Sequence, residues 1–212
     1  MTFDAMVRTL TVALARPLPG PAAHAALAPT PRRGWPAGVH PASPRRAAGL
    51  LLLFPIDGRA HVLFTVRAGT LGRHGGQVSL PGGVVEPGET LEEAALREAH
   101  EEVALPLRGV RVIGALTPLD IPVSGFRLYP VVATRATRPT LTASDGEVAS
   151  ILEVPVDDLC NPAHLRLTTR EHDGESIVVP AFHVGGEKIW GATAMVMAEF
   201  LALLTEAGQP ES

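Results

Sequence analysis

The sequence predicts one domain of mixed α/β structure, preceded by an N-terminal extension. Segments with the apolar spacing of strands and helices follow one another from about residue 46 to residue 206, without an internal repeat or a linker. The 212 residues are 46% hydrophobic, which is enough to bury a substantial core and too much for a disordered chain. We therefore expect a single main domain over residues 46–212.

Residues 1–45 form the predicted extension. A short amphipathic helix is expected over residues 2–15, because Phe3, Met6, Val7, Leu10 and Leu14 recur at helical spacing. Residues 17–44 contain eight prolines and little periodicity, which predicts an extended connector packed on the surface of the domain. The arginine pairs at 32–33 and 45–46 are interpreted as solvated charges that could also contact an anionic substrate.

Regular structure begins with a predicted β-hairpin. Residues 49–56 are a continuous apolar run typical of a buried strand, and Asp57–Gly58 is a typical tight turn. Residues 61–67 then form the returning strand. A glycine-rich segment, residues 69–88, separates this hairpin from the next element.

The most distinct helix is predicted over residues 90–103. Thr90 and Glu93 have the spacing of a capping box, in which each side chain satisfies a backbone N–H of the first turn. The apolar residues of this segment repeat every fourth position and predict its buried stripe. These residues are Leu91, Ala95, Ala99 and Val103.

The rest of the chain alternates between predicted strands and one further helix. Strands are expected over residues 110–117, 126–136, 150–154, 176–183 and 189–190, and an amphipathic helix over residues 193–205. Asp157 and Asp158 are expected in a turn after Pro155.

Composition excludes several classes of function. A formal net charge of −4 and a pI near 6.1 argue against nucleic-acid or membrane binding driven by bulk electrostatics. The longest apolar run, residues 47–56, is far shorter than the roughly 20 residues of a membrane helix. Asp4 and Arg8 interrupt any signal-peptide core, and the single cysteine, Cys160, cannot form an internal disulfide. We therefore expect a cytoplasmic protein.

Glutamates are concentrated in one stretch of the chain, with seven of the fifteen between residues 86 and 102. A solvated helix face is the ordinary explanation for such a stretch. However, Glu98, Glu101 and Glu102 lie three and four residues apart, so their carboxylates share one face and repel. A divalent cation, Mg²⁺ or Mn²⁺, would remove that repulsion. Gly82 and Gly83 let the backbone approach a metal or phosphate closely.

These residues follow a fixed spacing, Gly83-x5-Glu89-x7-Arg97-Glu98-x2-Glu101-Glu102, which resembles the signature of the Nudix hydrolases. The family's late glycine is Ala104 here, where we expect a small backbone adjustment at the helix exit. The resemblance implies an α+β fold, an α/β/α sandwich around a mixed β-sheet. It also implies hydrolysis of a nucleoside diphosphate derivative with the help of Mg²⁺ or Mn²⁺.

Carried over by position, the resemblance implies roles for individual residues. Glu98 and Glu102 would be the main metal ligands, with Gly82 at the same centre. Glu101 would be a further ligand or the general base. Arg97 is expected to point away from the metal face and to pair with Glu89 in a structural role. Glu147, in the later loop Ser144–Asp145–Gly146–Glu147, is the second candidate for the base.

The segment upstream of the acidic helix resembles the additional signature of the coenzyme A pyrophosphatase subgroup. The matching residues are Leu63, Thr65, Arg67, Ala68, Gly76, Pro81, Gly82 and Gly83. Phe64, Gly72 and Leu80 depart from the subgroup pattern, and Arg73 lies one place after the arginine that Gly72 replaces. Arg67, Arg73 and Gly83 are therefore candidate contacts of the substrate phosphates, although Arg67 could also pair locally at the end of a strand.

We therefore expect a pyrophosphatase that cleaves coenzyme A or its thioesters. The alternatives are another nucleoside diphosphate derivative (ADP-ribose, NADH, a dinucleotide polyphosphate or an oxidised nucleotide) or a non-catalytic nucleotide-binding module. The expected partner is this small substrate, without nucleic acid or membrane, and the family resemblance makes a homodimer plausible.

Overall fold

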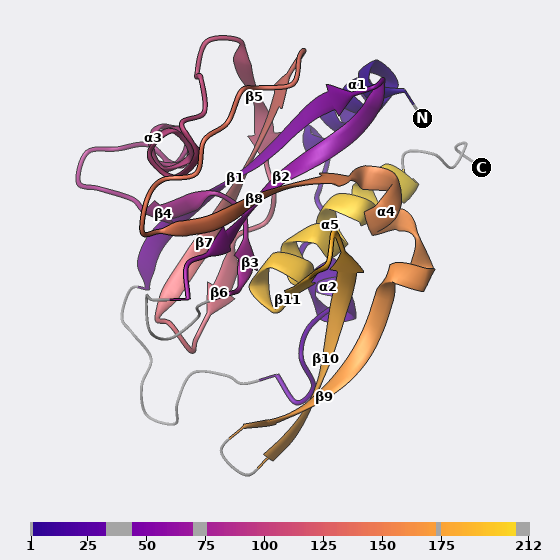
Figure 1. Ribbon diagram of the computed structural model, residues 1–212. Coiled ribbons are helices and arrows are strands. Elements are labelled where there is room, and N and C mark those ends of the chain that lie inside the picture. The colour runs from indigo at the N-terminus through magenta and orange to yellow at the C-terminus, as the bar shows by residue number, and fades with distance from the viewer. Residues whose placement is uncertain (1, 33–43, 70–75, 173–174, 207–212) are drawn as a thin grey trace.

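The computed structural model describes residues 2–32, 44–69, 76–172 and 175–206 (Figure 1). Eight strands form the main sheet: β1 (Arg45–Ile56), β2 (Arg59–Arg67), β3 (Val78–Ser79), β4 (Gly82–Val84), β5 (Val110–Ala115), β6 (Leu119–Ile121), β7 (Phe126–Arg135) and β8 (Val148–Pro155). β1 and β7 are parallel and the other pairs are antiparallel, so the sheet is mixed. Its central order is β3-β2-β1-β7-β5.

Helices cover both faces of the main sheet. α3 (Leu91–Val103) lies on one side, and α1 (Phe3–Leu14) and α5 (Ala192–Glu206) lie on the other (Figure 1). In β1, Leu50 and Leu52 pack in the cluster under α3, whereas Leu51 and Leu53 pack in the cluster under α1 and α5. After its two exposed arginines, β1 is apolar because both of its faces are covered there. The expected α/β/α sandwich around a mixed sheet is confirmed.

A second sheet extends away from the first. It contains β11 (Glu187–Trp190), β10 (Glu175–Val184) and β9 (Leu165–His172), in that order (Figure 1). β9 was not predicted, because Leu167 is 70% exposed and the strand is held mainly by backbone pairing with β10. Asp157 and Asp158 were expected in a turn, but they lie in α4 (Val156–Cys160), which the 3₁₀ helix Pro162–His164 follows.

The prediction of an extended connector after α1 was partly wrong. A short helix, α2 (Gly20–Ala26), forms there, with Pro19 as its N-cap. Proline is tolerated in the first turn of a helix, where the N–H groups have no intrahelical partner. Further along, Thr30 exchanges two backbone hydrogen bonds with Val178 of β10. Residues 33–43 lie outside the described part of the chain.

A fully buried carboxylate joins α2 to the core. Glu199 of α5 accepts hydrogen bonds from the backbone N–H of Gly20 (3.0 Å) and from both the backbone N–H (3.0 Å) and the hydroxyl (2.6 Å) of Thr117. His24 Nε2 lies 3.0 Å from Glu199 Oε2. Burial alone would raise the pKa of Glu199, but the His24, Thr117 and Gly20 hydrogen bonds outweigh it and the pKa is lowered.

Within the described residues, no helix is long and apolar enough to cross a membrane.

Candidate active site

The acidic helix α3 is fixed by its cap and its buried stripe. The Thr90 hydroxyl accepts the Glu93 N–H (3.2 Å) and the Glu93 carboxylate accepts the Thr90 N–H (2.9 Å), so the expected capping box is present. Ala95, Ala99 and Val103 are buried against the sheet. This packing leaves the glutamates of the last two turns on the remaining faces of the helix.

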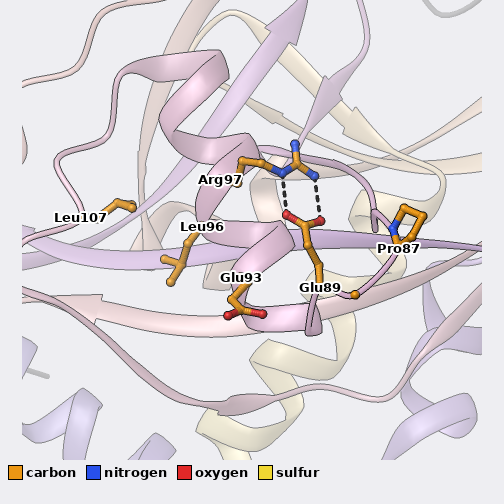
Figure 2. Close-up of a pocket in the computed structure, with 7 residues that line it drawn as sticks. Pro87, Glu89, Glu93, Leu96, Arg97 and Leu107 are labelled. Atoms are coloured by element: carbon orange, nitrogen blue, oxygen red, sulfur yellow. Dashed lines mark hydrogen bonds and ion pairs between the residues drawn. The ribbon is translucent and has the colours of Figure 1, made fainter.

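Arg97 braces the loop that precedes α3. Its Nε donates to Glu89 Oε1 (2.7 Å) and its Nη2 donates to Glu89 Oε2 (3.1 Å), the paired contact that Figure 2 shows. Nη2 also donates to the Val84 carbonyl (3.0 Å). Hydrogen bonds from Arg97 and from the Glu86 N–H lower the pKa of Glu89. The expected pairing of Glu89 with Arg97 is therefore present in the geometry.

The same guanidinium also contacts the glutamates that were expected to hold a metal. Arg97 Nη1 donates to Glu98 Oε1 (3.0 Å) and to Glu101 Oε2 (3.1 Å). The prediction that Arg97 points away from this face was therefore wrong. The cause is local: Glu101 lies four positions after Arg97 on the same helix face, and the long arginine side chain also reaches the adjacent Glu98.

The two glycines before α3 are required by close contacts. A Cβ on Gly83 would lie 2.3 Å from Glu98 Oε1, and a Cβ on Gly82 would lie 2.3 Å from the Ala48 carbonyl oxygen. The Gly82 N–H donates to Glu102 Oε2 (3.2 Å). Gly83 thus allows the acidic helix to pack directly on strand β4, and Gly82 allows β4 to lie close to β1.

Glu102 has the most perturbed carboxylate of the helix. Burial, helped by the nearby charges of Glu98 and Glu147, raises its pKa to about 7, although the Gly82 N–H and the charge of Arg67 act in the opposite direction. Burial also raises the pKa of Glu98. The fold therefore brings Arg67 and Glu147 close enough to Glu102 for their charges to act on it.

Backbone hydrogen bonds explain how Glu147 reaches this site from a distant part of the chain. The Ser144 N–H donates to the Glu102 carbonyl (2.8 Å), which ties the loop to the end of α3. The Ala68 N–H donates to the Glu147 carbonyl (2.8 Å), next to Arg67 at the end of β2. The side chains of Glu147 and Arg67 are exposed at this junction. Gly72 and Arg73 lie outside the described residues.

Comparison with known proteins gives a consistent result. The profile of the NUDIX domain matches residues 43–177. This chain belongs to the Nudix hydrolase family. A protein named "Uncharacterized Nudix hydrolase NudL" from Citrobacter koseri is 37% identical over 156 residues, which cover 73% of this chain and 81% of that protein. A protein of the same name from Pectobacterium atrosepticum is 39% identical over 124 residues, 58% of this chain and 64% of that protein.

Solved structures agree on the fold. RenU, a Nudix hydrolase from M. smegmatis, superposes with a TM-score of 0.53 at 24% identity, over 84% of this chain and 98% of its own. A MutT/nudix family protein from Enterococcus faecalis superposes with a TM-score of 0.50 at 16% identity, over 82% of this chain and 66% of its own. The Nudix fold is therefore established for this chain, and enzymes of this family are hydrolases of small nucleoside diphosphate derivatives.

Nudix hydrolases generally use divalent metal ions, and the acidic cluster of this chain fits one in its chemistry. Carboxylate oxygens are preferred ligands of such ions, and burial, with a smaller effect of the neighbouring glutamates, raises the pKa of Glu98 and Glu102, so their charged forms are disfavoured without a cation. As placed, no three acidic, histidine or cysteine side chains of the described chain converge on one point. Glu98 and Glu101 face Arg97 instead, so an ion would require them to turn toward Glu102.

A concavity of about 550 Å³ beside α3 is separate from this cluster. The Glu89–Arg97 pair, Glu93, Leu96 and Leu107 line it (Figure 2). None of Glu98, Glu101 or Glu102 belongs to its lining. The three candidate metal ligands lie instead in the last two turns of α3, on the side of the Glu147 loop.

The position of the missing Nudix glycine predicts a stability effect. Ala104 ends α3 in the left-handed conformation (φ 51°, ψ 35°), which costs a residue with a Cβ about 1 kcal/mol or more relative to glycine. Ala104→Gly is expected to raise the free energy of unfolding by about 0.5–1 kcal/mol, measured by urea denaturation. Asp57 also has a positive φ (50°), but aspartate tolerates this conformation. A gain for Ala104→Gly no larger than for Asp57→Gly would contradict the explanation.

Proposed function

We propose that this Nudix hydrolase cleaves the diphosphate of coenzyme A or its thioesters. The observation that carries the proposal is Arg67, which closes the Leu63-x-Thr65-x-Arg67-Ala68 pattern of the coenzyme A subgroup and whose charge acts on Glu102. An arginine fork on one side and an ion held by the carboxylates on the other would neutralise the two phosphates of a diphosphate. Gly83, which has no side chain, lets the Glu98 carboxylate lie directly against the β4 backbone at this site.

The reaction consumes one water molecule. Its oxygen forms a bond to one phosphorus of the diphosphate while the bond from that phosphorus to the bridging oxygen breaks. The products are 3′,5′-ADP and phosphopantetheine, or its acyl derivative. One proton of the water must be accepted by a carboxylate of the protein.

In this proposal Glu98, Glu102 and Glu101 hold Mg²⁺ or Mn²⁺ beside Gly82. The ion supplies charge neutralisation at the diphosphate and acidifies a bound water. Arg67 orients the substrate phosphates, and Arg73 is a further candidate for this role. Arg97 and Glu89 hold the loop before α3. Arg97 gives up its hydrogen bonds to Glu98 and Glu101 when those carboxylates turn toward the ion.

Glu147 is the better candidate for the general base. Glu101 accepts a hydrogen bond from Arg97 Nη1 (3.1 Å) and lies on the helix whose carboxylates would hold the ion, so both of these roles compete with that of a base. Glu147 lies near enough for its charge to act on Glu102, on a loop that is fixed to both α3 and β2. A base outside the metal-binding helix is also not a ligand of the ion, so its carboxylate is available to accept the proton.

Glu147→Gln is expected to lower kcat by about 10²- to 10³-fold, because glutamine cannot accept the proton. Glu101→Gln should lower it by less than about tenfold if Glu101 only supports the ion. Steady-state kinetics of both variants at saturating metal would compare them directly. A larger loss in Glu101→Gln than in Glu147→Gln would assign the base to Glu101.

The substrate is tested with the purified protein and either Mg²⁺ or Mn²⁺, by chromatography of the products. The panel contains coenzyme A, acetyl-coenzyme A, ADP-ribose, NADH, a diadenosine polyphosphate and an oxidised nucleoside triphosphate. We expect the coenzyme A compounds to be cleaved with the highest kcat/KM. Preferential cleavage of another compound would overturn the substrate and keep the family chemistry, whereas nucleotide binding without any cleavage would indicate a non-catalytic module.

A further inference from the structure

Arg46, near the start of β1, is held by an aromatic ring. Its guanidinium carbon lies 5.5 Å from the centroid of the Tyr129 ring, a cation–π contact. The side chain is exposed, and no carboxylate of the described residues forms an ion pair with it. The neighbouring Arg127 differs, because it donates two hydrogen bonds to Asp120 (2.6 and 3.1 Å). Arg46 therefore presents an oriented guanidinium that no acidic side chain of the described ranges neutralises.

The alternation of β1 places Arg46 on the same face of the sheet as the acidic helix. Ala48, Leu50 and Leu52 all pack in the hydrophobic cluster under α3, and Arg46 continues this series toward the start of the strand. Tyr129 belongs to the same face of β7, because Val131 and Ala133 pack in that cluster too.

Strand pairing shows how near this face is to the acidic cluster. Ala48 is opposite Gly83 across the β1–β4 pair, and Gly83 is the residue whose Cβ would touch Glu98. Arg46 lies two residues before Ala48, roughly 7 Å along the strand. The Val85 N–H donates to the Arg46 carbonyl (3.0 Å), so the backbone is fixed beside the loop that leads to α3. An arginine side chain can span this separation.

We propose that Arg46, seated on Tyr129, binds a phosphate group of the substrate outside the diphosphate that is cleaved. The inference rests on the proposed function, since coenzyme A carries such a group as its 3′-phosphate. A guanidinium binds a phosphate through two parallel hydrogen bonds, and stacking on the ring restricts its rotamers before the ligand arrives. Arg46 and Tyr129 would then distinguish coenzyme A from diphosphates without a third phosphate.

Binding of two nucleotides tests this subsite without turnover. Isothermal titration calorimetry compares 3′,5′-ADP with 5′-AMP, which lacks the 3′-phosphate. The wild-type protein should bind 3′,5′-ADP at least about tenfold more tightly, and Arg46→Ala should remove this preference. Arg46→Lys should retain only part of it, because an ammonium lacks the planar fork.

The chain offers a matched control at the preceding residue. Arg45 stacks on Phe126 with its guanidinium carbon 4.7 Å from the ring centroid, and it lies on the opposite face of the sheet by the alternation of β1. Arg45→Ala removes the same charge and the same type of contact, so it should keep the tenfold preference. Equal binding of both nucleotides by the wild type, or an equal loss in the two variants, would overturn the proposal.

Kinetics separate this inference from the proposed function. Arg46→Ala should lower kcat/KM for coenzyme A about tenfold or more and leave kcat/KM for 3′-dephospho-coenzyme A unchanged. An equal loss on both substrates would contradict a role in binding the 3′-phosphate. If the wild type cleaves neither compound but still binds 3′,5′-ADP more tightly than 5′-AMP in calorimetry, the proposed reaction is wrong and the proposed phosphate subsite is supported.

Discussion

Replacing Glu102 by glutamine is expected to lower kcat/KM by at least about 10³-fold while the protein stays folded. The Glu102 carboxylate accepts a hydrogen bond from the Gly82 N–H, and the charges of Glu98, Glu147 and Arg67 all act on its pKa. Loss of its charge would weaken the metal centre that neutralises the diphosphate, an effect of several kcal/mol. Glutamine keeps the shape and the oxygen that accepts the Gly82 N–H, so circular dichroism should be unchanged.

Glu92→Gln is the matched control for this experiment. Glu92 lies in the first turn of the same helix and is exposed. The variant removes the same charge from α3 and should retain activity within a factor of about two, apart from a few tenths of a kcal/mol of helix-dipole stabilisation. Wild-type rates in Glu102→Gln, or an equal loss in Glu92→Gln, would contradict the assignment of the acidic cluster.

The raised pKa of Glu102 also predicts a pH dependence of stability. An acid whose folded pKa, about 7, exceeds its unfolded value of about 4.5 stabilises the fold below pH 4.5 and loses this contribution as the pH rises through 7. The metal-free wild type should therefore lose about 1–3 kcal/mol relative to Glu102→Gln between pH 5 and pH 8. Chemical denaturation at both pH values measures the difference.

Magnesium should reverse this trend. The ion binds the ionised carboxylates of the native state only, so millimolar Mg²⁺ should raise the Tm of the wild type more at pH 8 than at pH 5. The increase should be much smaller in Glu102→Gln. An unchanged Tm of the wild type at pH 8 would count against a metal site in this cluster.

Local signals in the sequence were sufficient for most of the main sheet and for α3. The apolar run of β1 and the Thr90–Glu93 capping box are properties of neighbouring residues, and the structure has both. The prediction of secondary structure failed where tertiary contacts determine whether an element forms. α2 has only seven residues, too few for a visible period, and its Gly20 and His24 are held by a residue of α5. β9 carries apolar residues that stay exposed, so its pattern does not indicate burial.

The candidate site likewise has a part that the local sequence predicts and a part that depends on tertiary contacts. The spacing of Glu98, Glu101 and Glu102 within a helix is enough to place them together. The approach of Arg67 and Glu147 to Glu102 depends on hydrogen bonds between the ends of β2, α3 and the loop before β8, which no local pattern encodes. The resemblance to the family supplied these two residues. The stacking of Arg46 on Tyr129 depends on the parallel pairing of β1 with β7, and no feature of the sequence indicated it.

Glu199→Ala is expected to destabilise the protein by about 3–5 kcal/mol, a large part of the typical stability of a domain. The substitution leaves the N–H groups of Gly20 and Thr117, the Thr117 hydroxyl and the His24 ring without their buried acceptor. Glu199→Gln should cost less, because its amide oxygen still accepts hydrogen bonds while its NH₂ group faces other donors. Urea denaturation, with Glu92→Gln as an exposed control, measures both.

The segments that lose protection in the Glu199 variants distinguish the loss of this hydrogen-bond network from a general packing defect. Glu199 connects α5 to α2 and to the loop that carries Thr117, so its loss should release the N-terminal extension before the main sheet unfolds. Hydrogen exchange should therefore accelerate in α1 and α2 of Glu199→Gln, while β1 and β7 stay protected. Because the pKa of Glu199 is lowered in the folded protein, the ionised carboxylate stabilises the fold above pH 4.5, and this stabilisation is lost as the pH falls through the pKa of the folded state. The difference in the free energy of unfolding between wild type and Glu199→Gln should therefore become smaller in acid. Uniform acceleration across both sheets would show instead that Glu199 supports the whole core rather than the attachment of the extension.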